Sequence, residues 1–175
     1  SVLSSEYGRN MSLRHVTIST CGIVPRILQL ANLKTGLTLS VSLHASSDYV
    51  RNEIMPVNKT YNINELIDAC RYYIDKTGRR VTFEYAVIDD VNASPYEADK
   101  LSKLIKGLNC HVNLIPVNPI KERNYKTLRH TVQNFKKYLE KNGVNVTVRR
   151  TLGSDINAAC GQLRRNEINV KEVEY

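Results

Sequence analysis

The sequence lacks the patterns that mark several classes of protein. No stretch approaches the roughly 20 apolar residues of a membrane span, and no basic segment followed by an apolar one opens it, as a signal peptide would. Its four cysteines lie far apart, without the CxxC or Cys/His spacing of a local metal site. We therefore expect a cytoplasmic protein with reduced thiols and no metal site built from neighbouring residues.

What remains is a basic chain of ordinary hydrophobicity. With 175 residues, 42% of them hydrophobic, it is long enough for one sizeable core, and this length favours a single domain over residues 1–175. The formal net charge of +8 attracts polyanions. Four basic pairs are consistent with phosphate contacts, although each alone is more often solvated surface charge: Arg79-Arg80, Lys136-Lys137, Arg149-Arg150 and Arg164-Arg165. The charge favours a nucleic-acid partner without identifying one.

Five apolar runs enriched in β-branched residues alternate with segments of helical period. The runs cover residues 16–20, 37–43, 80–88, 111–117 and 144–149. This alternation, with short links, predicts an α/β fold with a parallel sheet and right-handed crossovers, either doubly wound or curled as part of a barrel.

The intervening segments carry helix start and stop signals. A short helix is expected to begin at Pro25, and a last one covers about residues 128–142, with Val132, Phe135, Tyr138 and Leu139 facing inward and Gly143 after it. Two further helices have capping signals at both ends. The first is expected to start at Asn62, with Glu65 completing a capping box, and to stop at Gly78. The second is expected to start at Ser94 and Pro95, with Glu97 reaching back to the cap, and to stop at Gly107.

Polar residues occur where the predicted strands end. In parallel α/β folds, ligands meet the carboxyl ends of strands, because the following loops can vary without disturbing the sheet. Ser19, Ser42 and Asn118 could hydrogen-bond a nucleoside or amino-acid ligand there, and His44 could do so without acting as an acid or base. Asp89 and Asp90 follow another strand end. Each of these residues taken alone is more often a turn or capping residue.

Cys160 stands among small and flexible residues. Ala158 and Ala159 offer its sulfur little cover, and Gly161 lets the backbone bend or approach a ligand closely. This setting suits a thiol that is presented to a reaction partner. The alternative is a small buried hydrophobic residue, the commoner state of a free cysteine.

Six segments in order resemble a known family. They are RHVTISTCGIVP (14–25), SLHA (42–45), IMPVNK (54–59), RVTFEY (80–85), CHVNLIPVNP (110–119) and DINAACGQL (155–163). Together they are similar to the C-terminal portion of the RlmN family, radical S-adenosylmethionine enzymes that methylate adenine C2 in ribosomal and transfer RNA.

The resemblance implies the later part of a partial (βα)6 radical SAM barrel over about residues 12–150, followed by a catalytic tail over about 151–165. Family members carry a CxxxCxxC motif for a [4Fe-4S] cluster and a glycine-glutamate segment that contacts S-adenosylmethionine, and neither occurs in this sequence. We therefore expect a fragment that is inactive in isolation, with the cluster ligands outside it and an external electron donor.

The resemblance also implies roles for individual residues. Ser19, the triplet Ser42, Leu43 and His44, and Asn118 match positions that bind S-adenosylmethionine. Cys160 matches the cysteine that is S-methylated before a radical on that methyl group adds to adenine C2. The other three cysteines match no catalytic position, and two of them are expected to be structural: Cys70 and Cys110.

Three alternatives to this function remain. Closely related enzymes methylate adenine C8, although the segments 20–22 and 115–118 look more like the C2 group. The isolated chain could instead act as a non-catalytic RNA-binding fragment. An unrelated small-molecule barrel enzyme is the third alternative.

Overall fold

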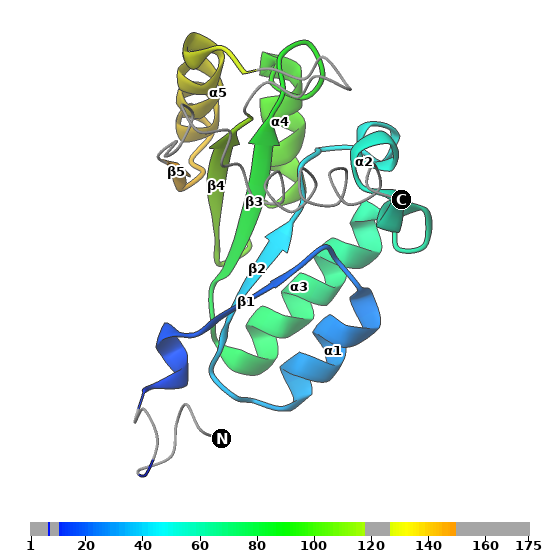
Figure 1. Ribbon diagram of the computed structural model, residues 1–175, viewed down its shortest axis with the longest axis vertical. Helices are drawn as coiled ribbons and strands as arrows, with labels where there is room; N and C mark the ends of the chain where they lie inside the picture. Colours follow the sequence, from blue (N-terminus) through cyan, green and yellow to red (C-terminus); the bar gives the residue numbers. More distant parts are fainter. Residues whose placement is uncertain (1–6, 8–10, 118–126, 150–175) are drawn as a thin grey trace, which may run out of the picture.

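The computed structural model describes residues 7, 11–117 and 127–149. Its centre is a parallel five-stranded sheet in which spatial order follows chain order, β1-β2-β3-β4-β5 (Figure 1). A doubly wound sheet reverses its strand order, so the described strands exclude that alternative. The strands are β1 (Thr17–Thr20), β2 (Thr38–Ser42), β3 (Val81–Val87), β4 (Cys110–Pro116) and β5 (Val146–Val148). Four of them lie within the predicted runs, and β4 overlaps the run over residues 111–117 but begins one residue earlier, at Cys110.

One short helix precedes β1, and the other helices lie in the connections between the strands. They are the 3-10 helices η1 (Leu13–His15) and η2 (Pro56–Lys59) and the α-helices α1 (Val24–Asn32), α2 (Asp48–Ile54), α3 (Ile63–Thr77), α4 (Pro95–Leu104) and α5 (Arg129–Lys141). The sequence patterns predicted α1, α3, α4 and α5 but not the three short helices η1, α2 and η2. No described helix has the length and apolar character needed to cross a membrane.

The predicted caps of α3 are confirmed. The Asn62 side chain accepts a hydrogen bond from the Glu65 amide, and the Glu65 carboxylate accepts one from the Asn62 amide, at 3.0 and 2.9 Å. These two bonds satisfy amides that have no partner inside the helix. Gly78 ends the helix with a φ of 63°, in the left-handed region that glycine adopts without strain.

Two predicted details of the later helices are wrong. Ser94 caps α4, but the Glu97 side chain does not reach back to it and instead binds the hydroxyl of Ser46. Both residues are buried, so this contact gives each a partner away from water. On α5, Val132, Phe135 and Leu139 are buried as predicted, whereas Tyr138 is 42% exposed, because its phenol can remain solvated at the edge of the helix face.

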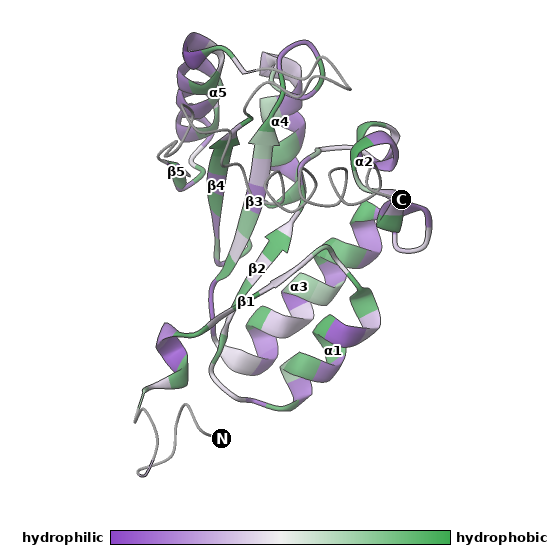
Figure 2. Cartoon of the chain, in the orientation of Figure 1, coloured by the Kyte–Doolittle hydropathy of each residue, from purple (hydrophilic) through white to green (hydrophobic). Residues whose placement is uncertain are grey.

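The two faces of the sheet differ in character. Along β3 the side chains alternate, so that Val81, Phe83, Tyr85 and Val87 are fully buried while the residues between them are only partly so. All four long helices pack with these buried side chains in one hydrophobic cluster, as right-handed crossovers between sequential strands require. Figure 2 shows the corresponding alternation of hydrophobic and hydrophilic segments along α1 and α3.

The opposite face of the sheet carries mostly polar side chains, and we call it the open face. By register and alternation, its described residues are Thr17, Ser19, Thr38, Ser40, Ser42, Thr82, Glu84, Ala86, His111, Asn113, Ile115 and Thr147. The open face and the carboxyl ends of the strands together frame the candidate site.

We expect Phe135→Ala to lower the free energy of unfolding by about 4 kcal/mol, because it removes a fully buried ring that stacks on Tyr85 at 5.2 Å between centroids. Tyr138→Ala, on the same helix, should cost less than about 1 kcal/mol. Urea unfolding followed by circular dichroism measures both. Equal losses for the two variants would contradict this packing of α5.

Candidate functional site

The carboxyl ends of β1 and β2 are held together by one buried side chain. Arg51, on α2, is 0% exposed. Its Nη2 donates to the carbonyls of Cys21 and Ser42 at 2.8 and 3.1 Å, and its Nε donates to the carbonyl of Leu43 at 3.0 Å. Its Nη1 donates to the Asn58 amide oxygen at 2.9 Å. The guanidinium thus satisfies three main-chain carbonyls from two different loops.

Asp48 and Asn58, in and after α2, surround the positive charge of Arg51 with polar groups. The Asp48 carboxylate accepts from the Asn58 side chain and from the Ile63 amide, both at 2.8 Å. Burial lowers the pKa of Arg51, and the nearby Cys21 and Asp48 oppose that effect. The side chain therefore keeps its charge through hydrogen bonds and a neighbouring carboxylate, although it has left water.

Gly22 allows the loop after β1 to approach the guanidinium. Its φ is 107°, and a Cβ placed there would lie 3.1 Å both from Arg51 Nη2 and from Leu66 Cδ2. A larger residue at this position would be strained and would also displace Arg51 or Leu66. Glycine is therefore required at this position for the contact between Arg51 and Cys21.

His44 lies two residues beyond the end of β2 and has an unusual conformation. Its φ is 58°, and its Nδ1 accepts a hydrogen bond from the Ala86 amide at 3.0 Å, where a strand carbonyl would otherwise accept. Burial, and then the charge of Arg51, lower the pKa of His44 to about 4. The imidazole is thus neutral, and because Nδ1 accepts, the proton resides on Nε2. The Nε2 proton is thus the group that His44 could offer to a ligand, and its binding of a ligand stays a prediction.

Asn92 joins the loops that follow β2 and β3. It is fully buried, and its Nδ2 donates to the carbonyls of His44 and Ala86 at 2.8 and 2.7 Å. Its Oδ1 accepts from the Ile88 amide at 2.8 Å, and its carbonyl accepts from the Tyr85 hydroxyl at 2.8 Å. The position of His44 is therefore fixed from both sides, by its ring and by its carbonyl.

The structure shows the positions of some of the predicted site residues but not of all. Ser19 on β1 and Ser42 on β2 belong to the open face. Leu43 and His44 follow the end of β2, and Arg51 joins Ser42 and Leu43 to the loop after β1. Asn118 and Cys160 lie outside the described residues. The sequence analysis missed Arg51 and Asn92. Each stands in a polar segment without a distinguishing local pattern, so no sequence signal separates it from a surface residue.

Asp89 and Asp90 prove to be turn and capping residues. The Asp89 Oδ2 accepts from the Leu128 amide at 2.9 Å and so satisfies the amino-terminal end of α5. Asp90 adopts a φ of 61°, typical of a turn. They line a cavity of about 390 Å³ together with Ser94, Glu97 and His130.

Cys70 and Cys110 fit structural roles better than catalytic ones. Burial raises the pKa of Cys70 to about 12 and that of Cys110 to about 11, so both thiols remain protonated and unreactive at neutral pH. Cys21 is exposed. Within the part of the chain that the structure describes, no three His, Cys, Asp or Glu residues are grouped to hold a metal ion.

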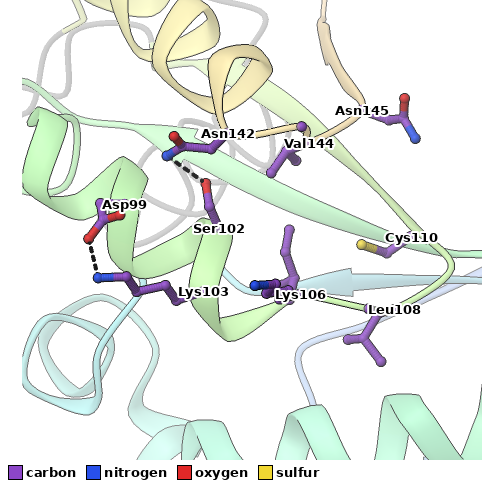
Figure 3. A pocket seen from close by; sticks show the side chains of 12 residues that line it. Asp99, Ser102, Lys103, Lys106, Leu108, Cys110, Asn142, Val144 and Asn145 are labelled. Carbon is purple, nitrogen blue, oxygen red and sulfur yellow. Dashed lines mark hydrogen bonds and ion pairs between the residues drawn. The ribbon is translucent and has the colours of Figure 1, made fainter.

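A second cavity, of about 300 Å³, opens at the opposite edge of the sheet (Figure 3). It lies between the carboxyl ends of α4 and α5 and the start of β4, and Ser102, Lys106, Cys110 and Asn142 are among its lining residues. Of the predicted ligand-binding residues that the structure describes, which are Ser19, Ser42, Leu43 and His44, none borders it. The carboxyl edge of the sheet is therefore the candidate site.

Comparisons with known proteins agree with the resemblance predicted from the six segments. No protein-family model matches the chain. The chain is 56% identical over 172 residues to the "Probable dual-specificity RNA methyltransferase RlmN" of Clostridium botulinum (strain Alaska E43 / Type E3), covering 98% of this chain and 50% of that protein. It is 54% identical over 174 residues to the protein of the same name from Clostridium beijerinckii, covering 99% of this chain and 49% of that protein. It thus spans about half the length of these relatives.

Solved structures show the same relationship. A radical SAM methyltransferase from Sphaerobacter thermophilus matches 91% of this chain and 47% of its own, with a TM-score of 0.86 and 46% identity. A domain of the pyruvate-formate lyase-activating enzyme from Bacteroides vulgatus matches with a TM-score of 0.59 and 13% identity, which shows a shared fold. The predicted fold class, strand-helix units of a radical SAM barrel, is confirmed.

We expect Arg51→Lys to lower the free energy of unfolding by about 3 kcal/mol, because an ammonium cannot serve three carbonyls and the Asn58 side chain at once. The matched control is Arg71→Lys, at an exposed position of α3, which should change it by less than about 0.5 kcal/mol. Urea unfolding measures both. Unchanged stability in Arg51→Lys would show that the hydrogen bonds of the Arg51 guanidinium do not stabilise the fold.

Proposed function

We propose that this chain, which belongs to the RlmN family over the half of those proteins that it spans, forms the S-adenosylmethionine-binding part of a cytoplasmic radical SAM methyltransferase acting on adenine C2 of ribosomal and transfer RNA. The observation that carries the proposal is the set of hydrogen bonds from Arg51 to the carbonyls of Cys21, Ser42 and Leu43, which we call the Arg51 clamp. The clamp holds the end of β2 beside the loop after β1. Ser19, Ser42 and Leu43 match family positions that bind S-adenosylmethionine.

We call the carboxyl edge of the sheet around Ser19, Ser42 and His44 the rim. Its geometry suits S-adenosylmethionine. Hydroxyls of Ser19 and Ser42 offer both donors and acceptors, and the neutral imidazole of His44 offers its Nε2 proton. A protonated imidazole would repel a ligand that carries a sulfonium, so the low pKa of His44 removes that repulsion. We infer that Ser19, Ser42, Leu43, His44 and Asn118 hold this ligand, which supplies a methyl group and, when reduced at a [4Fe-4S] cluster, a radical.

The cluster itself would be held elsewhere. A [4Fe-4S] cluster needs several thiolates in proximity, and the four cysteines of this sequence are widely separated. We propose that the cluster ligands belong to the half of the relatives that this chain does not span, and that an external donor supplies the electron. The isolated chain should then bind ligand and RNA at most, without turnover.

Cys160 is the proposed methyl acceptor. Adenine C2 is not nucleophilic, so a direct polar transfer of a methyl group to it would fail. A cysteine thiolate can accept the methyl group first: its Sγ forms a bond to the methyl carbon, and S-adenosylhomocysteine leaves. In this proposal the core covers about residues 12–150, and a catalytic tail over about 151–165 carries Cys160 to the rim.

RNA is the proposed partner because of charge as well as family. A formal net charge of +8 favours contacts with phosphates, and such contacts position a polynucleotide without reading its sequence. The selection of ribosomal and transfer RNA is inferred from the family.

In the full-length protein, we expect Cys160→Ala to abolish both C2 methylation of RNA and the methyl adduct on the protein, because no other thiol replaces the acceptor. Intact-mass analysis and nucleoside analysis of the RNA measure these two quantities. The matched control is Cys21→Ala, which removes an exposed thiol beside the rim and should leave both unchanged. Unimpaired methylation by Cys160→Ala would contradict the proposed chemistry.

A further inference from the structure

A chain of hydrogen-bonded side chains crosses the open face from β2 to β5. Ser40 Oγ donates to Glu84 Oε1 at 3.1 Å, and Asn113 Nδ2 donates to Glu84 Oε2 at 2.9 Å. Thr147 Oγ1 donates to Asn113 Oδ1 at 3.2 Å and lies 2.7 Å from His111 Nε2. Glu84, on β3, thus receives one donor from each neighbouring strand, and these two bonds fix both of its oxygens.

This network orients the Glu84 carboxylate without neutralising it. Glu84 is the one acidic side chain on the described open face, where the other polar residues are hydroxyls, an amide and an imidazole. Among the described residues, no lysine or arginine forms an ion pair with it. A carboxylate has about four acceptor positions, and Ser40 and Asn113 use two. Glu84 is also only partly buried, so the remaining positions can receive a ligand.

Glu84 lies next to the triplet that ends β2. It pairs with Ser42 in the sheet register, and its carbonyl accepts hydrogen bonds from the amides of Leu43 and His44 at 3.0 and 3.2 Å. Its side chain shares the open face with that of Ser42. A ligand held by the triplet would therefore lie within reach of this carboxylate.

The charges around the rim favour a negatively charged side chain beside a cationic ligand. S-adenosylmethionine carries a sulfonium and an α-ammonium group, whereas Arg51 places a buried positive charge directly behind Ser42 and Leu43. The neutral state of His44 avoids a second positive charge but supplies no attraction. A fixed carboxylate on the open face would offset the charge of Arg51 and attract the ligand's cationic end.

We propose that the Glu84 carboxylate binds the positively charged methionyl portion of S-adenosylmethionine. This inference rests on the proposed function of the rim. Glu84 then has two roles: its carbonyl positions Leu43 and His44, and its carboxylate selects ligands by charge.

Three ligands with two, one and no cationic groups test this assignment in the full-length protein. S-adenosylmethionine has both cationic groups, S-adenosylhomocysteine has only the ammonium, and 5′-methylthioadenosine has neither. Isothermal titration of Glu84→Gln should show at least about tenfold weaker binding of S-adenosylmethionine, since a charge-assisted contact is lost, and unchanged binding of 5′-methylthioadenosine. The homocysteine derivative then tells whether the ammonium contributes to the loss.

Two control variants separate charge from structure. Glu84→Asp keeps the charge and should retain most of the preference for the cationic ligands. Glu140→Gln removes the same charge from an exposed site on α5 and should bind all three ligands as the wild type does. Equal weakening of all three ligands in Glu84→Gln would mean that Glu84 is only structural, and wild-type affinity for S-adenosylmethionine would equally overturn the inference. A wild-type protein that binds no S-adenosylmethionine would overturn the proposed function, and the inference with it.

Discussion

One buried guanidinium sets the geometry at the carboxyl edge of this sheet. The carbonyls of Cys21, Ser42 and Leu43 lie where β1 and β2 have ended, so they can no longer pair along the ladder, and Arg51 satisfies all three. Leaving such groups buried without partners would cost roughly 1–3 kcal/mol each. The contact also requires Gly22, because only glycine lets the loop after β1 come this close. The rim is therefore held in shape before any ligand arrives, which favours binding because less ordering remains to be done.

The order of the strands determines what the clamped rim can do. Since all four long helices lie on one side, the other side of the sheet is free to carry polar groups, and a network centred on Glu84 occupies it. Glu84 connects this network to the rim through a carbonyl that accepts from Leu43 and His44. The positive charge behind the rim, the neutral imidazole on it and the carboxylate beside it form one electrostatic arrangement suited to a ligand with a cationic and a nucleoside part.

The sequence predicted those features that depend on near neighbours. Strand positions followed from apolar runs, and the caps of α3 followed from Asn62, Glu65 and Gly78, because such signals act over three or four residues. The strand-end rule selected Ser19, Ser42 and His44, which the structure places near the carboxyl ends of β1 and β2, and their binding of a ligand stays a prediction. The contacts of Glu97 and Arg51 could not be predicted from local patterns. Ser46, the partner of Glu97, is 51 residues away in the sequence, and Cys21, a partner of Arg51, is 30 residues away. Asn118 and Cys160 remain predictions, because both lie outside the described residues.

In the proposed function, S-adenosylmethionine binds at the carboxyl edge of the sheet, between the ends of β1 and β2. Hydrogen–deuterium exchange of the full-length protein, with and without S-adenosylmethionine, tests this most directly, because it locates protection along the backbone. We expect slower exchange at residues 19–22 and 42–44, with no change around the cavity at the opposite edge, near Leu108 and Cys110. Protection confined to that opposite cavity, or none at residues 42–44, would contradict this binding site.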